Sequence, residues 1–335
     1  MEKVKVGVIG LGWVSQVFHI PLLSKFDDVE IVALCDKNKE RTKLIAEKFT
    51  IAKYYTNFKK LLSKEKTDAI IVCTSTDAHC AVTKAALEAG NDVFVEKPIA
   101  RLYSEAVEMA ECAKVNKRKL MVGMNNRFRP DTMILKSFIE KGELGKVFYC
   151  KSGWFKNIAS NNSWLTKKEI AGGGVILDLG IVMLDLSLWL LGFPGVERVS
   201  TKTYRHKMKS VEDSAVVFIE LKGGATLIIE TSWSFQSDDE FFYCNFYGTE
   251  GSAMINPLRI HKELHGNLVN VTPARIETSH NLHKKSYENE LRHFIGVVRG
   301  SRQMVSTGEE AVKRMEIVEA IYQSAKKGKE VKISS

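Results

Sequence analysis

Two acidic residues within one apolar stretch are the first candidates for chemistry in this sequence. Asp178 and Asp185 lie in the segment from Gly172, GGGVILDLGIVMLD, which predicts a flexible triple glycine followed by a buried helix. The carboxylates are seven residues apart, so an α-helix places both on one face with Val182 between them. A buried carboxylate needs a partner. We therefore expect a charged, hydroxylated or water-filled surface to face this helix, and a functional role for Asp178.

A lysine followed by proline is the second candidate. Lys97 follows a short apolar run, Asp92 to Val95, in the sequence Glu96-Lys97-Pro98. Proline excludes a helix at this point and restricts the residue before it. A lysine in a cleft can orient substrate hydroxyls, or transfer a proton if its pKa is lowered. We predict Lys97 as the main proton-handling residue.

A glycine-rich turn predicts a nucleotide site. Val4 to Ile9 is an apolar run typical of a strand buried on both faces, and GLGWVS follows it, ahead of a helical pattern. Gly10 permits the tight turn, and Gly12 lets the backbone approach a pyrophosphate at the helix N-terminus. Ser15 takes the third glycine position and is small enough for close packing of helix and strand.

An acidic residue ends the next strand and indicates which dinucleotide binds. Asp36 follows the apolar run Val29 to Cys35. A carboxylate there suits the ribose hydroxyls of NAD and repels the 2′-phosphate of NADP. Lys37 and Arg41 are close enough in sequence to pair with a phosphate. The expected cofactor is NAD, and NADP is not excluded.

The elements that must position these residues alternate between strands and helices. Further strands are predicted at 69–73, 92–95 and 120–124. This alternation predicts an α/β Rossmann domain with a doubly wound parallel sheet over residues 1–124. Ligands of such sheets bind beyond the carboxyl ends of the strands. The candidates at those ends are Gly10, Asp36, Thr74, Glu96 and Asn125.

The pattern changes after residue 124. Beyond the apolar helix, long strands are predicted in succession at 196–204, 215–221, 225–233 and 241–247. This predicts an α+β domain with a large, mostly antiparallel open sheet over residues 125–335. One face of that sheet needs a cover, from the apolar helix or from another subunit. We expect a homodimer or homotetramer formed through this sheet.

Composition excludes several other classes. The chain has 335 residues and a formal net charge of +9, but no basic run alternates with aromatic residues, so no nucleic-acid partner is expected. Six cysteines without a CxxC pair predict free thiols in a reducing compartment. The N-terminus enters a strand at once, and the aspartates in the longest apolar run argue against a membrane span. We expect a cytoplasmic protein.

The remaining side chains give weaker signals. A polar loop from Phe155 to Glu169 precedes the glycines, and its candidates for contact with a polyhydroxylated ligand, counting the end of the preceding strand, are Trp154, Lys156, Asn157 and Trp164. The histidine pairs 261/265 and 280/283 have no cysteine or aspartate cluster around them, so no metal site is predicted.

These motifs together resemble the Gfo/Idh/MocA oxidoreductase family over nearly the whole chain. The matching stretches are GLGWVS near the start, TSTDAH at 74–79, EKP at 96–98, NRFRP at 126–130 and GGGVILDLGIVMLD at 172–185. Members of the family mostly interconvert alcohol and ketone groups on sugars, cyclitols or their nucleotide derivatives, with NAD or NADP. The resemblance therefore implies a small polyhydroxylated substrate.

The resemblance also implies roles for single residues. Glu96 is expected near the nicotinamide ribose, Lys97 against cofactor and substrate, and Asp178 beside Lys97 or on the substrate. Thr74, His79 and Asn125 are expected to line the nicotinamide side. The full set of expected contacts adds, for the cofactor, Trp13, Val14, Lys37, Arg41, Ser75 and Trp164, and, for the substrate, Arg127, Trp154, Lys156 and Val182.

Three positions depart from the family pattern. Val182 stands where the motif DxGxHxxD usually has an acid–base histidine, Ser75 replaces a common proline, and Leu165 replaces a frequent arginine near the cofactor. General acid–base catalysis contributes about 10²–10⁴-fold in rate, and valine cannot accept a proton. The candidates to supply it are Lys97, Tyr149, Tyr243, Tyr247 or a histidine from elsewhere.

The missing histidine leaves three functions open. The first is an NAD-dependent dehydrogenase of sugar- or cyclitol-like substrates. The second is a dinucleotide-binding sensor or regulator without turnover. The third is an NAD-assisted elimination or hydrolysis of glycosides, in which NAD is reduced and restored within one cycle.

Overall fold

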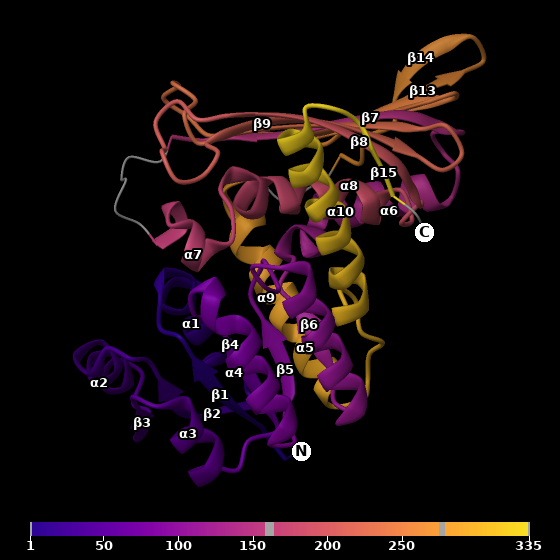
Figure 1. The fold of residues 1–335 in the computed structure, drawn as a ribbon. Coiled ribbons are helices and arrows are strands. Elements are labelled where there is room, and N and C mark those ends of the chain that lie inside the picture. The colour runs from indigo at the N-terminus through magenta and orange to yellow at the C-terminus, as the bar shows by residue number, and fades with distance from the viewer. Residues whose placement is uncertain (1, 158–163, 275–278, 334–335) are drawn as a thin grey trace. The chain divides into compact units, whose positions relative to one another are not determined.

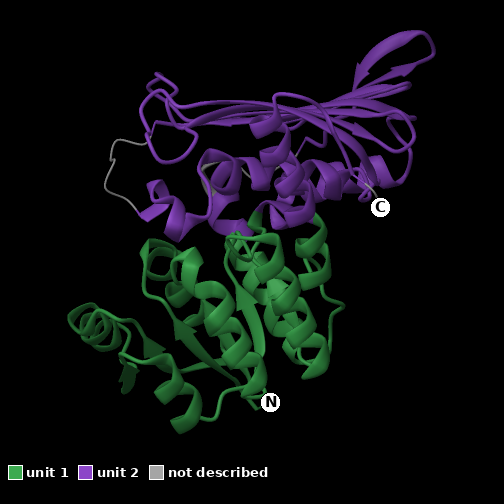
Figure 2. Ribbon diagram, viewed as in Figure 1, with its two compact units in different colours: residues 1–125, 287–313 green, residues 126–286, 314–335 purple. Residues whose placement is uncertain are grey.

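The computed structural model describes residues 2–157, 164–274 and 279–333 (Figure 1). Two compact units share the chain: residues 1–125 and 287–313 form the first, and residues 126–286 and 314–335 form the second (Figure 2). The predicted division into 1–124 and 125–335 has a single boundary. In the structure the chain passes from one unit to the other three times, at 125/126, 286/287 and 313/314.

The first unit contains a six-stranded sheet of order β3-β2-β1-β4-β5-β6, in which every neighbouring pair is parallel. The predicted Rossmann sheet is confirmed. Its strands are β1 (Val4–Ile9), β2 (Val29–Cys35), β3 (Lys53–Tyr55), β4 (Ala69–Val72), β5 (Asp92–Val95) and β6 (Leu120–Val122). The apolar side chains of β1, β4, β5 and β6 are almost entirely buried, as expected for a sheet covered on both faces.

Helices connect these strands and cover the sheet. They are η1 (Ser15–His19), α1 (Ile20–Leu23), α2 (Lys39–Lys48), α3 (Phe58–Lys64), α4 (Thr76–Glu88) and α5 (Tyr103–Val115), followed by the short 3₁₀ turn η2 (Asn125–Phe128). Much of α9 (Ser279–Val298) and the start of α10 (Gly308–Lys327) also belong to this unit. Tyr287 of α9 stacks on Phe18 with ring centroids 4.2 Å apart, and Val122 donates its N–H to the carbonyl of Ser306 at 2.9 Å. These contacts join residues 287–313 to the first unit, although most of the second unit precedes them in sequence.

The second unit contains a nine-stranded sheet of order β14-β13-β12-β11-β7-β10-β9-β8-β15. Among the strands that the structure describes, only β7 and β10 pair in parallel, so the predicted mostly antiparallel sheet is confirmed. Its strands are β7 (Val147–Phe155), β8 (Val196–Tyr204), β9 (Ser214–Leu221), β10 (Thr226–Ser232), β11 (Phe241–Gly248), β12 (Gly251–Ile255), β13 (Arg259–Leu264), β14 (Asn267–Asn270) and β15 (Val331–Lys332).

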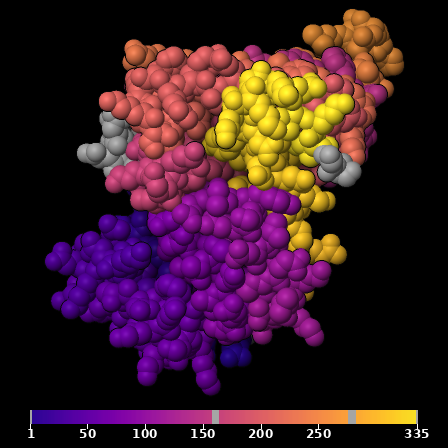
Figure 3. Space-filling model, viewed as in Figure 1, coloured from indigo at the N-terminus to yellow at the C-terminus, as the bar shows by residue number. Residues whose placement is uncertain are grey.

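The helices of the second unit lie on one side of this sheet (Figure 1). They are α6 (Pro130–Glu140), η3 (Trp164–Thr166), α7 (Lys168–Ala171), η4 (Ile176–Gly180), α8 (Ile181–Leu190) and the main part of α10, whose outer side forms part of the surface in Figure 3. Helix α8 contacts β7 and β10, and Ser187 donates to the Ser152 hydroxyl at 3.2 Å. The segment Lys168–Leu190 is long and apolar enough to span a membrane, but 94% of its apolar window is buried inside the protein. It is the core helix of this unit.

Candidate functional site

The glycine turn has the geometry of a dinucleotide loop. Gly10 has φ +95°, and a Cβ there would overlap the backbone of Cys73, so only glycine fits. A Cβ on Gly12 would meet no atom within 4 Å, which leaves open space beside the backbone. Ser15 donates its hydroxyl to the carbonyl of Gly10 at 2.6 Å and so fastens the turn to the helix that follows.

Asp36 is held directly against this turn. One carboxylate oxygen accepts the N–H of Leu11 and the other accepts the N–H of Asn38, both at 2.8 Å. Arg41 approaches the first oxygen at 3.6 Å, and Lys37 is exposed. The carboxylate therefore stands beside the glycine backbone at the end of β2, where an adenosine ribose would be bound. The open side of Gly12 and this fixed acid fit NAD.

The other expected cofactor residues of the first unit lie at the same strand ends. Trp13 is 66% exposed and contacts Phe18 edge to face. Thr74 and Ser75 are half-buried between β4 and α4, and the Ser75 hydroxyl donates to Asp77 at 2.5 Å. The half-buried positions also include Val14 and Asn125. Trp164, by contrast, belongs to the second unit, where it is 38% exposed in η3.

The turn after β5 is held by a buried ion pair. Glu96 accepts a 2.7 Å hydrogen bond from the ring Nε2 of His19 and a 3.2 Å bond from the N–H of Lys97. Burial raises the pKa of Glu96, but His19 and Lys97 outweigh it, so the net pKa lies below the ordinary value. Burial lowers the pKa of His19, but Cys73 and Glu96 raise it well above the ordinary value. Glu96 is thus an anion whose charge is paired with His19.

His19 is a site residue that the sequence analysis did not find. It ends the π-helical turn η1 and is fully buried. A single histidine in a helical pattern looks the same in sequence whether it belongs to a core or to a site. Only the distance to Glu96, which is 77 positions away, shows its role.

His79 supports the backbone instead of lining a ligand space. It is 1% exposed, and its ring nitrogens lie 2.9 Å from the carbonyl oxygen of Pro98 and 3.0 Å from that of Thr74. Both nitrogens are therefore occupied by main chain. The expected direct contact of His79 with nicotinamide is replaced by a contact with the two segments expected to bind it.

Asp178 lies in the π-helical turn η4 and is half-buried. Its carboxylate accepts the indole N–H of Trp233 at 3.1 Å. Trp233 follows β10, and the N–H of Lys156 donates to Ser232 at 3.0 Å on the same strand end. The parallel pairing of β10 with β7 therefore carries Asp178, Trp154 and Lys156 to one end of the sheet.

Trp154 and Lys156 form a cation–aromatic pair at this end. The ammonium of Lys156 lies 5.3 Å from the Trp154 ring centroid, and the indole N–H of Trp154 donates to Glu240. Asn157, also at this end, forms an isolated bridge with Ser234. An aromatic face, a cation and two carboxylates are suited to a polyhydroxylated ligand. The rest of the predicted loop includes residues 158–163, which lie outside the described residues.

The triple glycine is a close-packed segment, which corrects the expectation of flexibility. A Cβ on Gly173 would overlap the Tyr322 hydroxyl, and one on Gly174 would overlap the backbone of Glu212. Glu212 in turn accepts the N–H groups of Gly174 at 2.9 Å and Ile176 at 3.1 Å. Glycine is required here for close approach, and Glu212 stabilises the start of the helix that carries Asp178.

Arg127 was expected to contact substrate, and the structure corrects this. Its guanidinium binds Asp185 with two hydrogen bonds, of 2.5 and 2.8 Å, and is 1% exposed. Arg314 adds a second cation 2.9 Å from the same carboxylate. Val182 also belongs to the core, since it is 4% exposed. Arg127, Asp185 and Arg314 hold the fold of the second unit together.

The tyrosines considered as proton acceptors lie on the wrong side of the sheet. Along β7, Ser152 faces α8, so its neighbours on the strand face away from the helix. Tyr149 lies on that opposite face and stacks on Tyr247, with centroids 5.3 Å apart, while Tyr243 is opposite Gly153. None of the three shares the face on which Asp178 lies.

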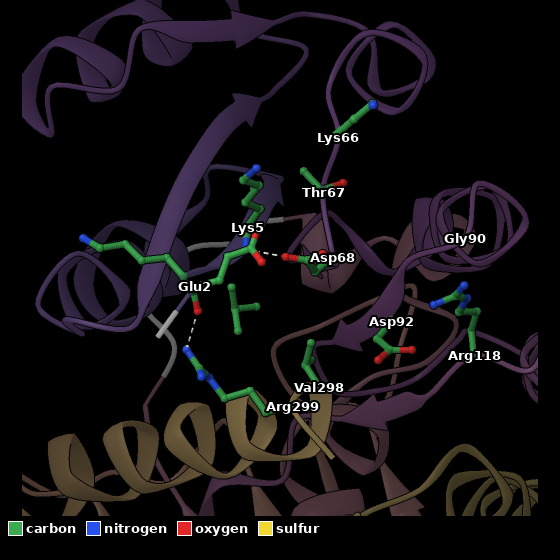
Figure 4. Close-up of a pocket in the computed structure, with 12 residues that line it drawn as sticks. Glu2, Lys5, Lys66, Thr67, Asp68, Gly90, Asp92, Arg118, Val298 and Arg299 are labelled. Carbon is green, nitrogen blue, oxygen red and sulfur yellow. Dashed lines mark hydrogen bonds between the residues drawn. The ribbon is translucent and has the colours of Figure 1, made fainter. Parts of the chain in front are cut away.

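One hollow in the first unit lies away from this chemistry (Figure 4). It has a volume of about 580 Å³ and is lined by residues at the amino ends of β1, β4 and β5, whereas the glycine turn follows the carboxyl end of β1. Two of its charged side chains bind main-chain groups: Asp68 accepts the backbone N–H of Lys5 at 2.8 Å, and Arg299 donates to the backbone carbonyl of Glu2 at 3.0 Å. Parallel sheets bind ligands at the other edge. Among the described residues, no group of three histidine, cysteine or acidic side chains could hold a metal ion.

Comparison with known proteins decides the family. A model described as "Oxidoreductase family, NAD-binding Rossmann fold" matches residues 4–124, and one described as "Oxidoreductase family, C-terminal alpha/beta domain" matches residues 136–333. The chain belongs to the Gfo/Idh/MocA family. The predicted oxidoreductase class and NAD as cofactor are thereby confirmed, and the chain is an NAD-dependent dehydrogenase of the Gfo/Idh/MocA type.

Full-length relatives within the Gfo/Idh/MocA family act on sugars and inositols. D-glucoside 3-dehydrogenase of Escherichia coli K12 is 29% identical, and the match covers 99% of this chain and 98% of the relative. scyllo-Inositol 2-dehydrogenase (NAD(+)) of Bacillus subtilis 168 is 27% identical and covers 99% and 97%. The solved structure of GenD2 from gentamicin A biosynthesis, in complex with NAD, matches with a TM-score of 0.88 at 25% identity and covers 100% and 97%.

Proposed function

We propose that this dehydrogenase transfers a hydride between NAD and a secondary alcohol or ketone of a sugar- or cyclitol-like substrate. The observation that carries the substrate class is the meeting of Trp154, Lys156 and Asp178 at one end of β7 and β10. Aromatic faces bind the apolar side of a sugar ring, and charged groups bind its hydroxyls. The names of the glucoside and inositol dehydrogenases among its relatives support the same class.

Each unit supplies its own part of the chemistry. NAD, when bound, accepts or donates the hydride. Lys97 exchanges a proton with the substrate oxygen, because Val182 offers no acceptor in the second unit. Asp178 accepts hydrogen bonds from substrate hydroxyls while Trp233 fixes its carboxylate. Asp36 binds the ribose hydroxyls and discriminates against a 2′-phosphate.

The first test is a panel of pyranosides, pyranoses and inositols assayed by NADH absorbance and by product analysis. With the best substrate, Lys97→Ala should lower kcat by about 10²–10⁴-fold. Lys66→Ala is the matched control, because Lys66 is exposed beside the hollow at the opposite edge of the sheet. Full turnover by Lys97→Ala would refute the role of Lys97.

The same panel separates the alternatives. Tight NADH binding without turnover on any substrate would favour a sensor or regulator over the dehydrogenase. Product formation without net NADH, abolished when all nicotinamide is removed, would favour NAD-assisted elimination or hydrolysis.

Cofactor choice has its own test. Asp36→Ala should weaken NAD and improve relative binding of NADP, because it removes both the ribose acceptor and the repulsive charge. The shift is measured as the ratio of kcat/KM for the two cofactors. An unchanged ratio would show that another residue discriminates between them.

We also propose that two copies pair through the sheet of the second unit. The face opposite α8 carries Val216 and Phe218 of β9 and Tyr247 of β11, which are 42%, 40% and 37% exposed. The strand register places all three on one side, together with Tyr149. Exposed apolar side chains gathered on one sheet face are typical of an interface, and the ion pair Lys151–Glu230 lies on the same face. Sedimentation should give a dimer or tetramer that Phe218→Glu disrupts, and a stable wild-type monomer at micromolar concentration would overturn the proposal.

A further inference from the structure

Two buried histidines of the first unit bind opposite ends of the turn that carries Lys97. His19 lies 2.7 Å from a carboxylate oxygen of Glu96, the residue before Lys97. His79 lies 2.9 Å from the carbonyl oxygen of Pro98, the residue after it. The N–H of Lys97 itself donates to the second carboxylate oxygen of Glu96 at 3.2 Å. The backbone on both sides of Lys97 is therefore fixed to helices.

The histidines come from different helices of the unit. His19 ends η1, directly after the glycine turn, and His79 lies in the first turn of α4. Through its second nitrogen, His79 also contacts the carbonyl of Thr74 at 3.0 Å. Both imidazoles are at most 1% exposed, so neither is available to a ligand from solvent. Their contacts hold the Lys97 turn to the parts of the unit expected to bind the cofactor.

The two contacts of His79 are not equivalent. Carbonyl oxygens only accept, so a neutral imidazole can donate to one of them and not to both. Burial lowers the pKa of His79. The hydrogen bonds to the carbonyls of Pro98 and Thr74 and the charge of Glu96 raise it, but the net pKa stays below the ordinary value. At neutral pH His79 therefore carries one ring proton. Directed to Pro98, that proton holds the residue adjacent to Lys97.

We infer that His19 and His79 are positioning residues that set the orientation of Lys97, His19 through Glu96 and His79 through the carbonyl of Pro98. The inference rests on the proposed function for the part of Lys97 in turnover. Its structural part concerns only the first unit. A displacement of about 1 Å in a reacting group costs on the order of 10²-fold in rate, so such contacts are sufficient to control activity.

Asparagine and glutamine separate the two nitrogens of each ring. The amide nitrogen of asparagine takes roughly the place of Nδ1, and that of glutamine the place of Nε2. At position 79, His79→Asn keeps a donor for Pro98 and His79→Gln keeps one only for Thr74. At position 19, where Nε2 binds Glu96, the order is reversed: His19→Gln keeps the contact and His19→Asn loses it. His293→Gln is the control, because His293 is a buried histidine of the same unit that accepts the N–H of Val305 at 3.2 Å.

The measurements are kcat with the best substrate, its pH profile, the dissociation constant of NADH and the thermal midpoint. We expect His79→Asn and His19→Gln to stay within about threefold of wild type in kcat. His79→Gln and His19→Asn should lose on the order of 10²-fold in kcat. They should also displace the pH profile and raise the NADH dissociation constant about tenfold. Both quantities are measured well below the thermal midpoint of each variant, so that a loss of stability does not enter them. His293→Gln should change neither kcat nor NADH binding.

The reversed order between the two positions assigns each effect to one nitrogen of the ring, and assays below the thermal midpoint of every variant separate it from a loss of stability. Equal kcat for the asparagine and glutamine variants at either position would overturn the inference, as would a similar loss in His293→Gln. If the wild-type chain oxidises no substrate, the proposed function fails alone. The positioning role is then decided by the NADH dissociation constants, which require no turnover.

Discussion

Two aspartates of one continuous helical segment have opposite environments. Asp178, in the π-helical turn, is half-buried, and its carboxylate accepts a hydrogen bond from the indole of Trp233. Asp185, in α8, is 2% exposed and is bound by Arg127 and Arg314. A half-buried carboxylate can still be reached by a ligand, whereas one that is 2% exposed and enclosed by two cations cannot. The segment thus combines a group available for binding with a group committed to the fold.

The largest expected effect follows from removing one of the two arginines that bind Asp185. Arg127→Leu leaves a buried carboxylate with one cation, and removing a partner from a buried pair costs about 3–5 kcal/mol. Urea unfolding should show this loss, and kcat/KM per folded molecule should remain near wild type. Adding Asp185→Leu should not restore the stability, because it also removes the carboxylate that pairs with the buried Arg314. A stable Arg127→Leu protein with a raised KM would instead return Arg127 to the substrate site.

The next effect concerns the available side. Asp178→Asn keeps an oxygen for Trp233 and removes the charge, so stability should change by less than about 1 kcal/mol. kcat/KM should fall by about 10²-fold, because a charged acceptor for substrate hydroxyls is lost. Steady-state kinetics and urea unfolding on the same preparation give both numbers. A loss of stability without a loss of kcat/KM would make Asp178 a structural residue like Asp185.

A smaller effect is expected from the group that fixes the start of the helix. Tyr322 donates to Glu212 at 2.8 Å, and the same oxygen accepts the N–H groups of Gly174 and Ile176. Tyr322→Phe should cost about 1–2 kcal/mol in stability and lower kcat/KM less than Asp178→Asn does. Tyr54→Phe, at a position 39% exposed in the first unit, is the control. No change in stability would place the support of this helix elsewhere.

The smallest effect appears only as a pH dependence. Burial raises the pKa of Asp185, but Arg127 and Arg314 outweigh it, so the net pKa is below the ordinary value. Its contribution to stability is therefore complete above the unfolded pKa of about 3.9 and is lost as the pH falls through the folded pKa. Unfolding free energies measured from pH 6 downwards should show this slope in wild type and in Asp178→Asn. Asp185→Asn should show a shallower slope, because Glu96, whose pKa is also lowered, still contributes. An unchanged slope in this variant would assign the acid sensitivity to other groups.

The sequence determined the sheet of the first unit and its ligand-binding edge because buried parallel strands are continuous apolar runs with polar residues at their ends. Gly10 and Asp36 could be placed for this reason, and they lie together in the structure. The relation between Asp178 and Asp185 could not be placed in the same way. A regular helix puts them on one face, but the π-helical turn Ile176–Gly180 changes the angle per residue between them. Their different partners reflect this shift.

Long-range partners account for the other differences. The motif around Arg127 indicated a ligand contact, but its partner Asp185 is 58 positions away and no periodicity connects them. The triple glycine was expected to be flexible. Its close packing could not be predicted, because Glu212 and Tyr322, which approach it, are distant in sequence. His19 was missed for the same reason.

The order of the two units along the chain has a consequence for folding during synthesis. Neither unit is contiguous, since the first is completed by residues 287–313 and the second by residues 314–335. A nascent chain that ends before residue 314 lacks Arg314, which pairs with Asp185 in α8. One that ends before residue 322 lacks Tyr322, which packs against Gly173 and donates to Glu212. Neither core can therefore close before these later segments have been synthesised. Helix α10 supplies both Arg314 and Tyr322, so the second unit closes only after the segment that completes the first.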